Sequence, residues 1–305
     1  MSKNLVLTSS PHIRSASSTS VIMLDVLIAL MPAFAASVYF FGIRALYLSL
    51  VCVTACVFFE WMYRKMLGLT DTSRDLSAAV TGLLLAYNLP SSMPFWMAII
   101  GCFVAIIIVK QLFGGLGKNF ANPAIVARIT LMASFGTYTT TWPMARDAIT
   151  QATPLAIPAG EVMPGYLDLL IGNVSGSMGE TSAIALIIGG IYLVYRGIIS
   201  ITTPVAFLGT MAVLSLALGG DPLYQILAGG AMLGAIFMAT DYSTSPTTER
   251  GKVIFGIGCG VMTIVIRFYG AFPEGVSFAI LLMNIITPHI DQMTTIKAFG
   301  GVNVK

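Results

Sequence analysis

Long apolar runs that carry almost no charge are the feature that most constrains this chain. Only 10% of its 305 residues are charged and 56% are hydrophobic, a balance far from that of a soluble domain. A helix needs about 20 apolar residues to cross the hydrocarbon core of a bilayer. Candidate spans lie at residues 21–41, 45–67, 76–89, 95–113, 120–136, 182–195, 202–218, 223–240, 253–269 and 275–290. The sequence therefore predicts an all-α membrane protein with about ten transmembrane helices.

The third candidate span is unusually short. Its sequence, LSAAVTGLLLAYNL, stops at Pro90 and is too short to cross a bilayer comfortably. A short or irregular segment at membrane depth is tolerated only where protein surrounds it or it lines a cavity. We therefore expect a half-helix or a tilted helix at this point.

The basic residues predict the orientation of the chain. If the N-terminus is cytoplasmic, Arg44, Arg146 and Arg267 fall outside, Arg128 lies within a span, and the other twelve of the sixteen Lys and Arg fall inside. Cytoplasmic loops of membrane proteins carry such an excess of positive charge. We therefore expect cytoplasmic N- and C-termini and one long extracytoplasmic loop, residues 137–181.

This loop divides the chain into two sets of five spans. The predicted segments are a cytoplasmic N-terminal segment (1–20), a first five-helix half (21–136), the loop (137–181), a second five-helix half (182–290) and a cytoplasmic C-terminal tail (291–305). An odd number of spans per half makes a repeat inverted in the membrane. Gly82 in AAVTGLLLA also aligns with Gly234 in GAMLGAIFM. We expect two inverted five-helix repeats.

Several ionisable residues fall within or at the ends of the spans, where an unpaired charge costs at least a few kcal/mol. Asp25 lies in the first span and is our candidate for an ion path, since intramembrane carboxylates commonly mark such paths. Glu60 and Arg128 fall in other spans. The alternatives are structural acid–base pairs between helices or, for Lys110 and Arg267, snorkelling toward the interface.

The glycine-rich segment GGLGKNFANPA, residues 114–124, leads into a predicted helix with Pro123 in its first turn. Exposed backbone N–H groups at a helix start suit an anionic or polar ligand, such as a phosphate or the edge of a flavin. The segment matches neither the dinucleotide fingerprint nor the Walker pattern. A tight cytoplasmic turn without a ligand is the alternative.

The loop sequence DAITQATPLA, residues 147–156, contains two threonines in a polar setting. The loop has no histidine, so nucleophilic catalysis by a threonine activated by a histidine base is not expected. Pro154 favours an extended backbone at Thr153, which would present the hydroxyl as a substrate for modification.

The arrangement of Asp147, Thr150, Ala152 and Thr153 resembles the site Asp-x-x-(Ser/Thr)-x-Ala-Thr, where a flavin transferase esterifies FMN through its phosphate to the last threonine. The segments SPHIRS, TGLLLAYNLP, KQLFGGLGKNFANPA and TERGKVIFG resemble, in the same order, the D subunit of the Rnf complex. This resemblance covers nearly the whole chain. The B subunit of the sodium-translocating NADH:quinone reductase is a weaker match, because its site reads Ser-Gly-Ala-Thr.

The resemblance implies an electron-carrying subunit of a redox-driven pump in a bacterial or archaeal inner membrane. The pump would couple electron transfer between ferredoxin and NAD to the movement of Na⁺ or H⁺. FMN would be bound covalently to Thr153 on the outer face, and a second, non-covalent flavin such as riboflavin is expected near Gly117, Lys118, Asn119 and Asn122. The implied partners are the other membrane and peripheral subunits, a flavin transferase and membrane lipid. No metal site, no nucleic-acid binding and no turnover by the isolated chain are expected.

Two alternatives follow from the residues alone. A small-solute permease or channel is also built from about ten helices with an inverted repeat and a short third span. A scaffold subunit without a cofactor would result if Ala148 and Gln151 prevented modification of Thr153.

Overall fold

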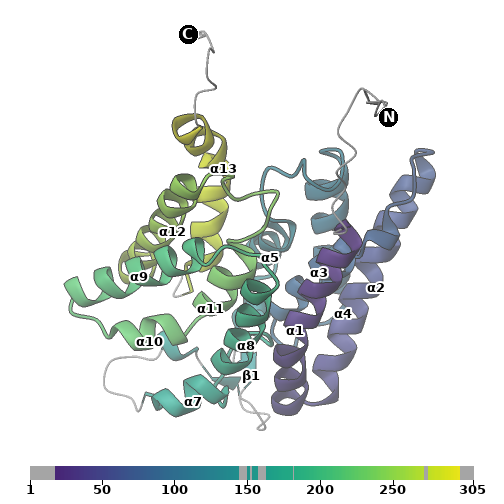
Figure 1. Ribbon diagram of the computed structural model, residues 1–305. Helices are drawn as coiled ribbons and strands as arrows, with labels where there is room; N and C mark the ends of the chain where they lie inside the picture. Colours follow the sequence, from purple (N-terminus) through teal and green to yellow (C-terminus); the bar gives the residue numbers. More distant parts are fainter. Residues whose placement is uncertain are drawn as a thin grey trace, which may run out of the picture.

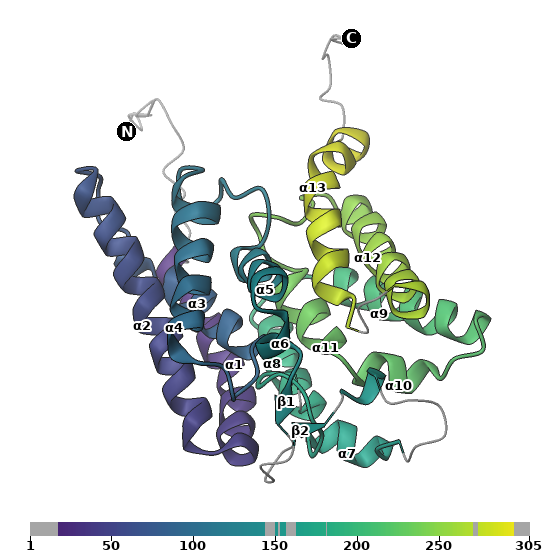
Figure 2. The ribbon, with the colours of Figure 1, turned by 180° about the vertical axis from the view of Figure 1, so that it is seen from behind.

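The fold of the described residues is helical, as the sequence predicts. The computed structural model describes residues 18–143, 150–151, 153–156, 163–180, 182–270 and 274–295. Within these ranges the only strands are β1 (Trp142–Pro143) and β2 (Thr150–Gln151), a short antiparallel pair. Figures 1 and 2 show the helices of the first half beside those of the second half.

The first half follows the expected spans closely. Its elements are α1 (Thr19–Phe41), α2 (Ile43–Met66), η1 (Ser73–Asp75), α3 (Ser77–Tyr87), α4 (Phe95–Phe103), the π-helix η2 (Val104–Gln111), α5 (Pro123–Ser134) and α6 (Gly136–Thr139). Helix α5 begins as its sequence predicts. Pro123 occupies the first helical position, and the Asn122 side chain accepts hydrogen bonds from the N–H groups of Ala124 and Ile125, which are two of the donors that a helix start leaves unpaired.

The second half differs from the sequence prediction at one place. Its elements are α8 (Ala183–Tyr195), α9 (Thr202–Ala217), α10 (Pro222–Leu227), α11 (Ala231–Leu233), the π-helix η4 (Gly234–Met238), α12 (Glu249–Tyr269) and α13 (Val276–Thr294). The expected span 223–240 is therefore interrupted between α10 and α11. Gly229 and Gly230 occupy this break with φ values of 65° and 71°, a left-handed conformation that glycine adopts without steric cost.

The lengths of the helices indicate a membrane protein. Three of the described helices, α1, α2 and α12, are long and apolar enough to cross a membrane. Helix α3 has only 11 residues, and all of them are buried. The expectation that the short third span is surrounded by protein is thus confirmed.

Small residues bring helices into direct backbone contact. A Cβ atom added at Gly256 of α12 would lie 2.9 Å from the Thr203 carbonyl oxygen of α9, and one at Gly260 would lie 2.8 Å from the carbonyl oxygen of Phe207. Lipid tails are as apolar as the helix surfaces, so close packing of this kind is a main source of helix association in membranes. The two glycines therefore fix the contact between α9 and α12.

The elements of the loop between the two halves lie at one end of the molecule, together with α10 of the second half. Helix α7 (Tyr166–Ile171), the strands and α10 lie at this end, which we call the loop end, whereas α2 and α13 finish at the opposite end (Figures 1 and 2). The 3-10 helix η3 (Pro154–Ala156) begins directly after Thr153. Thr153 therefore lies between two short elements of the long loop.

We predict that Gly230→Ala destabilises the protein more than Gly197→Ala. Gly197 has a similar φ of 68° with open space around it, whereas a Cβ atom at Gly230 would overlap Glu180 Oε1. The backbone cost shared by both substitutions is about 1–2 kcal/mol. At Gly230 the buried Glu180 carboxylate must also move away from Arg128, which raises the total loss to about 3 kcal/mol or more. Unfolding measurements in detergent test this, and equal losses for the two variants would contradict it.

Candidate functional site

Thr153, the predicted acceptor, is buried at the loop end. Its side chain is 3% exposed, and among the described residues its Oγ1 atom has no hydrogen-bond partner. The residue borders a small pocket with about 20 Å³ of free space. Asp147 and Ala152 lie outside the described residues, and Thr150 is placed only as part of β2. Four buried serine hydroxyls, those of Ser37, Ser49, Ser177 and Ser215, also have no partner among the described residues, so Thr153 is distinguished by its place in the loop motif together with this lack of a partner.

The segment that follows Thr153 is packed against α7 and α10. The Tyr224 hydroxyl of α10 donates a hydrogen bond to the Pro154 carbonyl oxygen at 2.9 Å. Leu155 packs against a small apolar cluster formed by Leu169, Val174, Tyr224 and Ala228. Residues 153–156 are therefore held in place by contacts with α7 and α10. No pattern in the sequence points to Tyr224.

A buried ion cluster lies beside the Thr153 pocket. Arg128 of α5 donates hydrogen bonds to Asn88 Oδ1 at 2.6 Å and to Glu180 Oε1 at 2.8 Å, and its other terminal nitrogen pairs with Glu274. Glu180 and Glu274 both line the pocket that Thr153 borders. The sequence marked Arg128 as an intramembrane charge, but its two acidic partners lie outside the spans and were not anticipated.

Arg267 of α12 lies in the same region and binds backbone carbonyl oxygens. Its guanidinium donates to the carbonyl oxygens of Ala228 at 3.0 Å, Gly229 at 3.1 Å and Glu274 at 3.2 Å. The first two carbonyls belong to the break between α10 and α11, where helical partners are missing. The snorkelling alternative for Arg267 is therefore wrong, because its guanidinium binds backbone oxygens of the break.

The charge of the cluster is sensitive to pH through Glu274, which lies in the connection between α12 and α13. Burial raises the pKa of Glu274 to about 7, against the lowering effect of Arg128, and the nearby Glu180 adds to the rise. Its Oε1 atom is buried and pairs with no other group that the structure describes. Burial therefore favours the protonated form of Glu274, and the ion pair with Arg128 opposes it.

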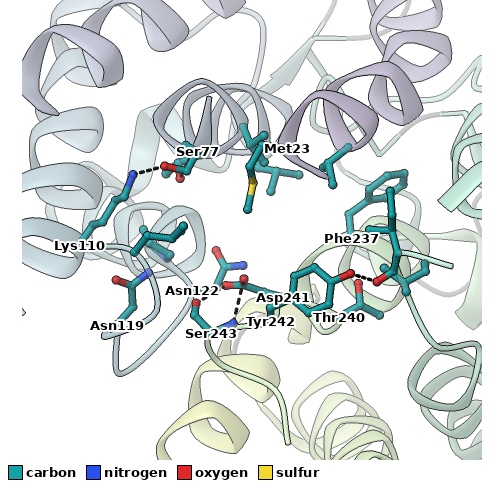
Figure 3. A pocket seen from close by; sticks show the side chains of 18 of the residues that line it. Met23, Ser77, Lys110, Asn119, Asn122, Phe237, Thr240, Asp241, Tyr242 and Ser243 are labelled. Atoms are coloured by element: carbon teal, nitrogen blue, oxygen red, sulfur yellow. Dashed lines mark hydrogen bonds between the residues drawn. The ribbon is translucent and has the colours of Figure 1, made fainter. Parts of the chain in front are cut away.

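A second pocket lies between the two halves, toward the opposite end from Thr153. Figure 3 shows Lys110 and Asn119 on one side of this inter-half pocket and Phe237 on the other. Its polar lining consists of Ser77, Thr81, Lys110, Asn119, Asn122, Thr240, Asp241, Tyr242 and Ser243. The rest of the lining is largely apolar, which is the usual character of a site for a small organic ligand or cofactor.

The structure separates the four residues that the sequence assigned to a second flavin. Asn119 and Asn122 line the inter-half pocket, whereas Gly117 and Lys118 are exposed and do not line it. Asn119 is 9% exposed, and its Oδ1 atom has no partner in the described part of the chain. A buried amide oxygen without a partner is suited to accept a hydrogen bond from a ligand.

The inter-half pocket continues into a wider cavity. Its own free volume is about 80 Å³, below the range of roughly 300–1,000 Å³ typical of sites for drug-sized ligands. The adjoining cavity has about 450 Å³ and shares Ile198, Ile199, Thr240 and Tyr242 with it. The Tyr242 hydroxyl bonds to the Ile198 carbonyl oxygen between the two spaces. A tricyclic ligand would therefore have to occupy both spaces or displace Tyr242.

Lys110 is held at the edge of this pocket by an acid from α2. Its Nζ atom lies 2.8 Å from Glu60 Oε2 and 2.6 Å from Ser77 Oγ, and both charged side chains are 1% exposed. Gln111 and Thr72 donate to the other Glu60 oxygen, each at 2.9 Å. Lys110 is therefore part of a fully hydrogen-bonded pair between helices, and the snorkelling alternative is wrong for this residue also.

Asp25, the candidate for an ion path, joins α1 to α8. The Tyr192 hydroxyl donates to its Oδ1 at 2.8 Å, and Arg196 Nη2 lies 2.8 Å from its Oδ2. Asp25 is buried, whereas the Arg196 side chain is 46% exposed. An ion that approaches Asp25 would have to displace one of these two donors, of which Arg196 is the more exposed.

Nearly the whole chain matches one protein family. The model of the NQR2, RnfD, RnfE family matches residues 6–300, which include the Thr153 site, the ion cluster and the inter-half pocket.

Curated relatives match over a similar length. The D subunit of the Na(+)-translocating ferredoxin:NAD(+) oxidoreductase complex of Acetobacterium woodii is 49% identical over 99% of this chain and 97% of its own length. The D subunit of the proton-translocating ferredoxin:NAD(+) oxidoreductase complex of Clostridium ljungdahlii is 42% identical over 98% of this chain and 97% of its own. The D subunit of the ion-translocating oxidoreductase complex of Ectopseudomonas mendocina is 35% identical over 95% of this chain and 94% of its own.

Proposed function

Because the chain belongs to the NQR2, RnfD, RnfE family, we propose that it is the D subunit of a membrane complex that couples electron transfer between ferredoxin and NAD to ion movement. Relatives that bear this subunit name match almost its whole length. One of them is named for Na⁺ and the other for protons, so family membership is compatible with either ion. The partners that follow from this assignment are the other subunits of the complex.

We further propose that this subunit carries FMN as a phosphoester of Thr153. The observation that carries this proposal is the Thr153 hydroxyl itself. It occupies the acceptor position of the attachment motif and, within the described chain, has no hydrogen-bond partner. When bound, FMN supplies one-electron transfer steps. Arg128 pairs with both carboxylates that line the Thr153 pocket, Glu180 and Glu274, which limits the repulsion that a phosphodiester would meet there.

A second, non-covalent flavin such as riboflavin fits the inter-half pocket in its chemistry. A flavin ring edge presents acceptor, donor and acceptor groups in a row. Asn119 offers an amide oxygen without a partner in the described chain, which suits the central N–H of this edge. The Asn122 amide nitrogen already donates to the Met238 carbonyl oxygen at 3.5 Å, and Lys110 to Glu60 and Ser77. Asn119 would therefore hold the ring edge, and the hydroxyl-rich wider cavity would receive a polar side chain.

The loop end is proposed to face away from the cytoplasm, with both termini on the cytoplasmic side. Arg64 and Lys65 end α2 at the opposite end, as the charge rule requires of a cytoplasmic end. In each half, the third predicted span contains a short, buried helical element. This element is α3 in the first half and α11 with η4 in the second. This correspondence supports the expected inverted repeat.

We predict that Thr153 carries all the covalent flavin of this chain. After co-expression with a flavin transferase, the wild-type band on a denaturing gel should fluoresce, and Thr153→Val should abolish the fluorescence because it removes the acceptor oxygen. Thr263→Val, which replaces a threonine buried in α12, is the control and should fluoresce normally. A dark wild-type band beside a labelled control acceptor protein would contradict the proposal and favour the cofactor-free scaffold or the permease.

We predict that Asn119→Leu weakens binding of the non-covalent flavin roughly tenfold, since a ligand N–H would lose its partner in a buried site. The measurement is the flavin released from the purified protein by acid, with the covalent fluorescence at Thr153 as the internal reference. Lys118→Ala is the matched control because Lys118 lies in the same loop but is exposed. Equal amounts of released flavin from the wild type, Asn119→Leu and Lys118→Ala would exclude Asn119 from the site.

We predict that Asp25→Asn lowers the number of ions taken up per NAD reduced in vesicles that contain the assembled complex. Tyr192→Phe removes one hydrogen bond to Asp25 but leaves the carboxylate, and should keep the ratio. If Asp25 serves only to join α1 to α8, Asp25→Asn will reduce the amount of assembled complex and leave the ratio unchanged.

A further inference from the structure

We propose that residues 153–156 form a latch that must leave its packed position before Thr153 can be modified, and that Tyr224 holds this latch closed. The inference rests on the flavin attachment proposed above. It concerns how the acceptor becomes accessible, which the presence of an attachment motif does not determine.

The packed position hides the acceptor atom. Thr153 is 3% exposed, and the pocket at its side chain offers about 20 Å³. A cavity needs about 10–15 Å³ of such volume to hold one water molecule. This space has room for a water molecule and none for a phosphodiester with its flavin, so a flavin at Thr153 requires the segment to leave this position.

The attachment chemistry requires an open approach to the hydroxyl. In transfer from a flavin adenine dinucleotide, a bond forms between Thr153 Oγ1 and the phosphorus of FMN, and the bond from that phosphorus to AMP breaks. AMP leaves with the displaced electron pair, the hydroxyl proton is released, and no group is oxidised or reduced. Oγ1 must approach the phosphorus on the side opposite to the leaving AMP, and the packed segment prevents the donor from reaching Oγ1.

Two kinds of contact keep the latch closed. The Tyr224 hydroxyl donates to the Pro154 carbonyl oxygen at 2.9 Å in a buried position. Leu155 inserts beside Gly229, where an added Cβ atom would overlap Leu155 Cδ1. The side chain of Leu155 thus fills the space that the glycine leaves free. Both contacts join the segment to α10 and to the helix break, and neither involves a residue of the attachment motif.

A thiol in place of the acceptor hydroxyl reports on the latch without any flavin. Thr153→Cys changes the side chain little in size, and its reaction with a membrane-impermeant maleimide measures how often the segment opens. Leu167→Cys on α7, where Leu167 is 72% exposed, is the open reference. The background is low because the native cysteines, Cys52, Cys56, Cys102 and Cys259, are all buried.

We expect Thr153→Cys to react at least about tenfold more slowly than Leu167→Cys. Adding Tyr224→Phe should raise the Thr153→Cys rate roughly three- to tenfold, which is the fold-change expected for the loss of one hydrogen bond. Leu155→Ala should act in the same direction through lost packing. Tyr166→Phe is the matched control because the Tyr166 hydroxyl bonds to Asp221 and does not touch the latch. Equal rates for the two thiols, or no effect of Tyr224→Phe, would overturn the inference.

Flavin transfer to the folded protein then tests whether the latch limits modification. Full-length protein made without a transferase is incubated with a purified transferase and flavin adenine dinucleotide, and the fluorescence of the band is followed over time. Tyr224→Phe should be labelled several-fold faster than wild type and Tyr166→Phe at the wild-type rate. A faster thiol reaction without faster flavin transfer would overturn the role of the latch. If no band is labelled even after co-expression, the proposed attachment fails, whereas the thiol rates still decide whether the latch exists.

Discussion

The pairing of charges inside an apolar protein is the constraint on which this structure depends. An isolated charge at membrane depth costs at least a few kcal/mol, so each buried cation must meet an anion or several oxygen acceptors with good geometry. Arg128 meets Glu180 and Glu274. Lys110 meets Glu60 at 2.8 Å. These pairs join segments that are far apart in the chain, and the Arg128 cluster in particular connects α5 of the first half to the connections that precede α8 and α13.

The helix break in the second half is a consequence of the same constraint. A break in a helix frees carbonyl oxygens that have no water to bind in an apolar setting. Arg267 supplies donors to the Ala228 and Gly229 carbonyl oxygens, while Gly230 leaves room for the Glu180 carboxylate. The break, the ion cluster and the segment after Thr153 are therefore one connected region. Flavin attachment at Thr153 would occur beside charges that already hold the two halves together.

The candidate sites were only partly predictable from the sequence. Thr153 was recognisable from its motif, and Asn119 and Asn122 from the helix start that they precede. Gly117 and Lys118 belong to the same stretch but are exposed and lie outside the pocket, and Gly117 turns the backbone there with a φ of 82°. Local sequence indicates that such a turn exists, whereas the other wall of the pocket comes from η4 and the residues after it.

Local patterns were enough to predict the class of protein, most of the helix boundaries and the shortness of α3, and they single out Thr153 as the candidate acceptor. These properties depend on composition, on the length of apolar runs and on a contiguous motif. Only the folded chain shows which charges pair, where the helix of residues 223–240 breaks, and that Thr153 is buried at the start of a segment that Tyr224 holds. Such properties arise from contacts between residues 38 or more positions apart, and each depends on the three-dimensional packing of helices that no local pattern specifies.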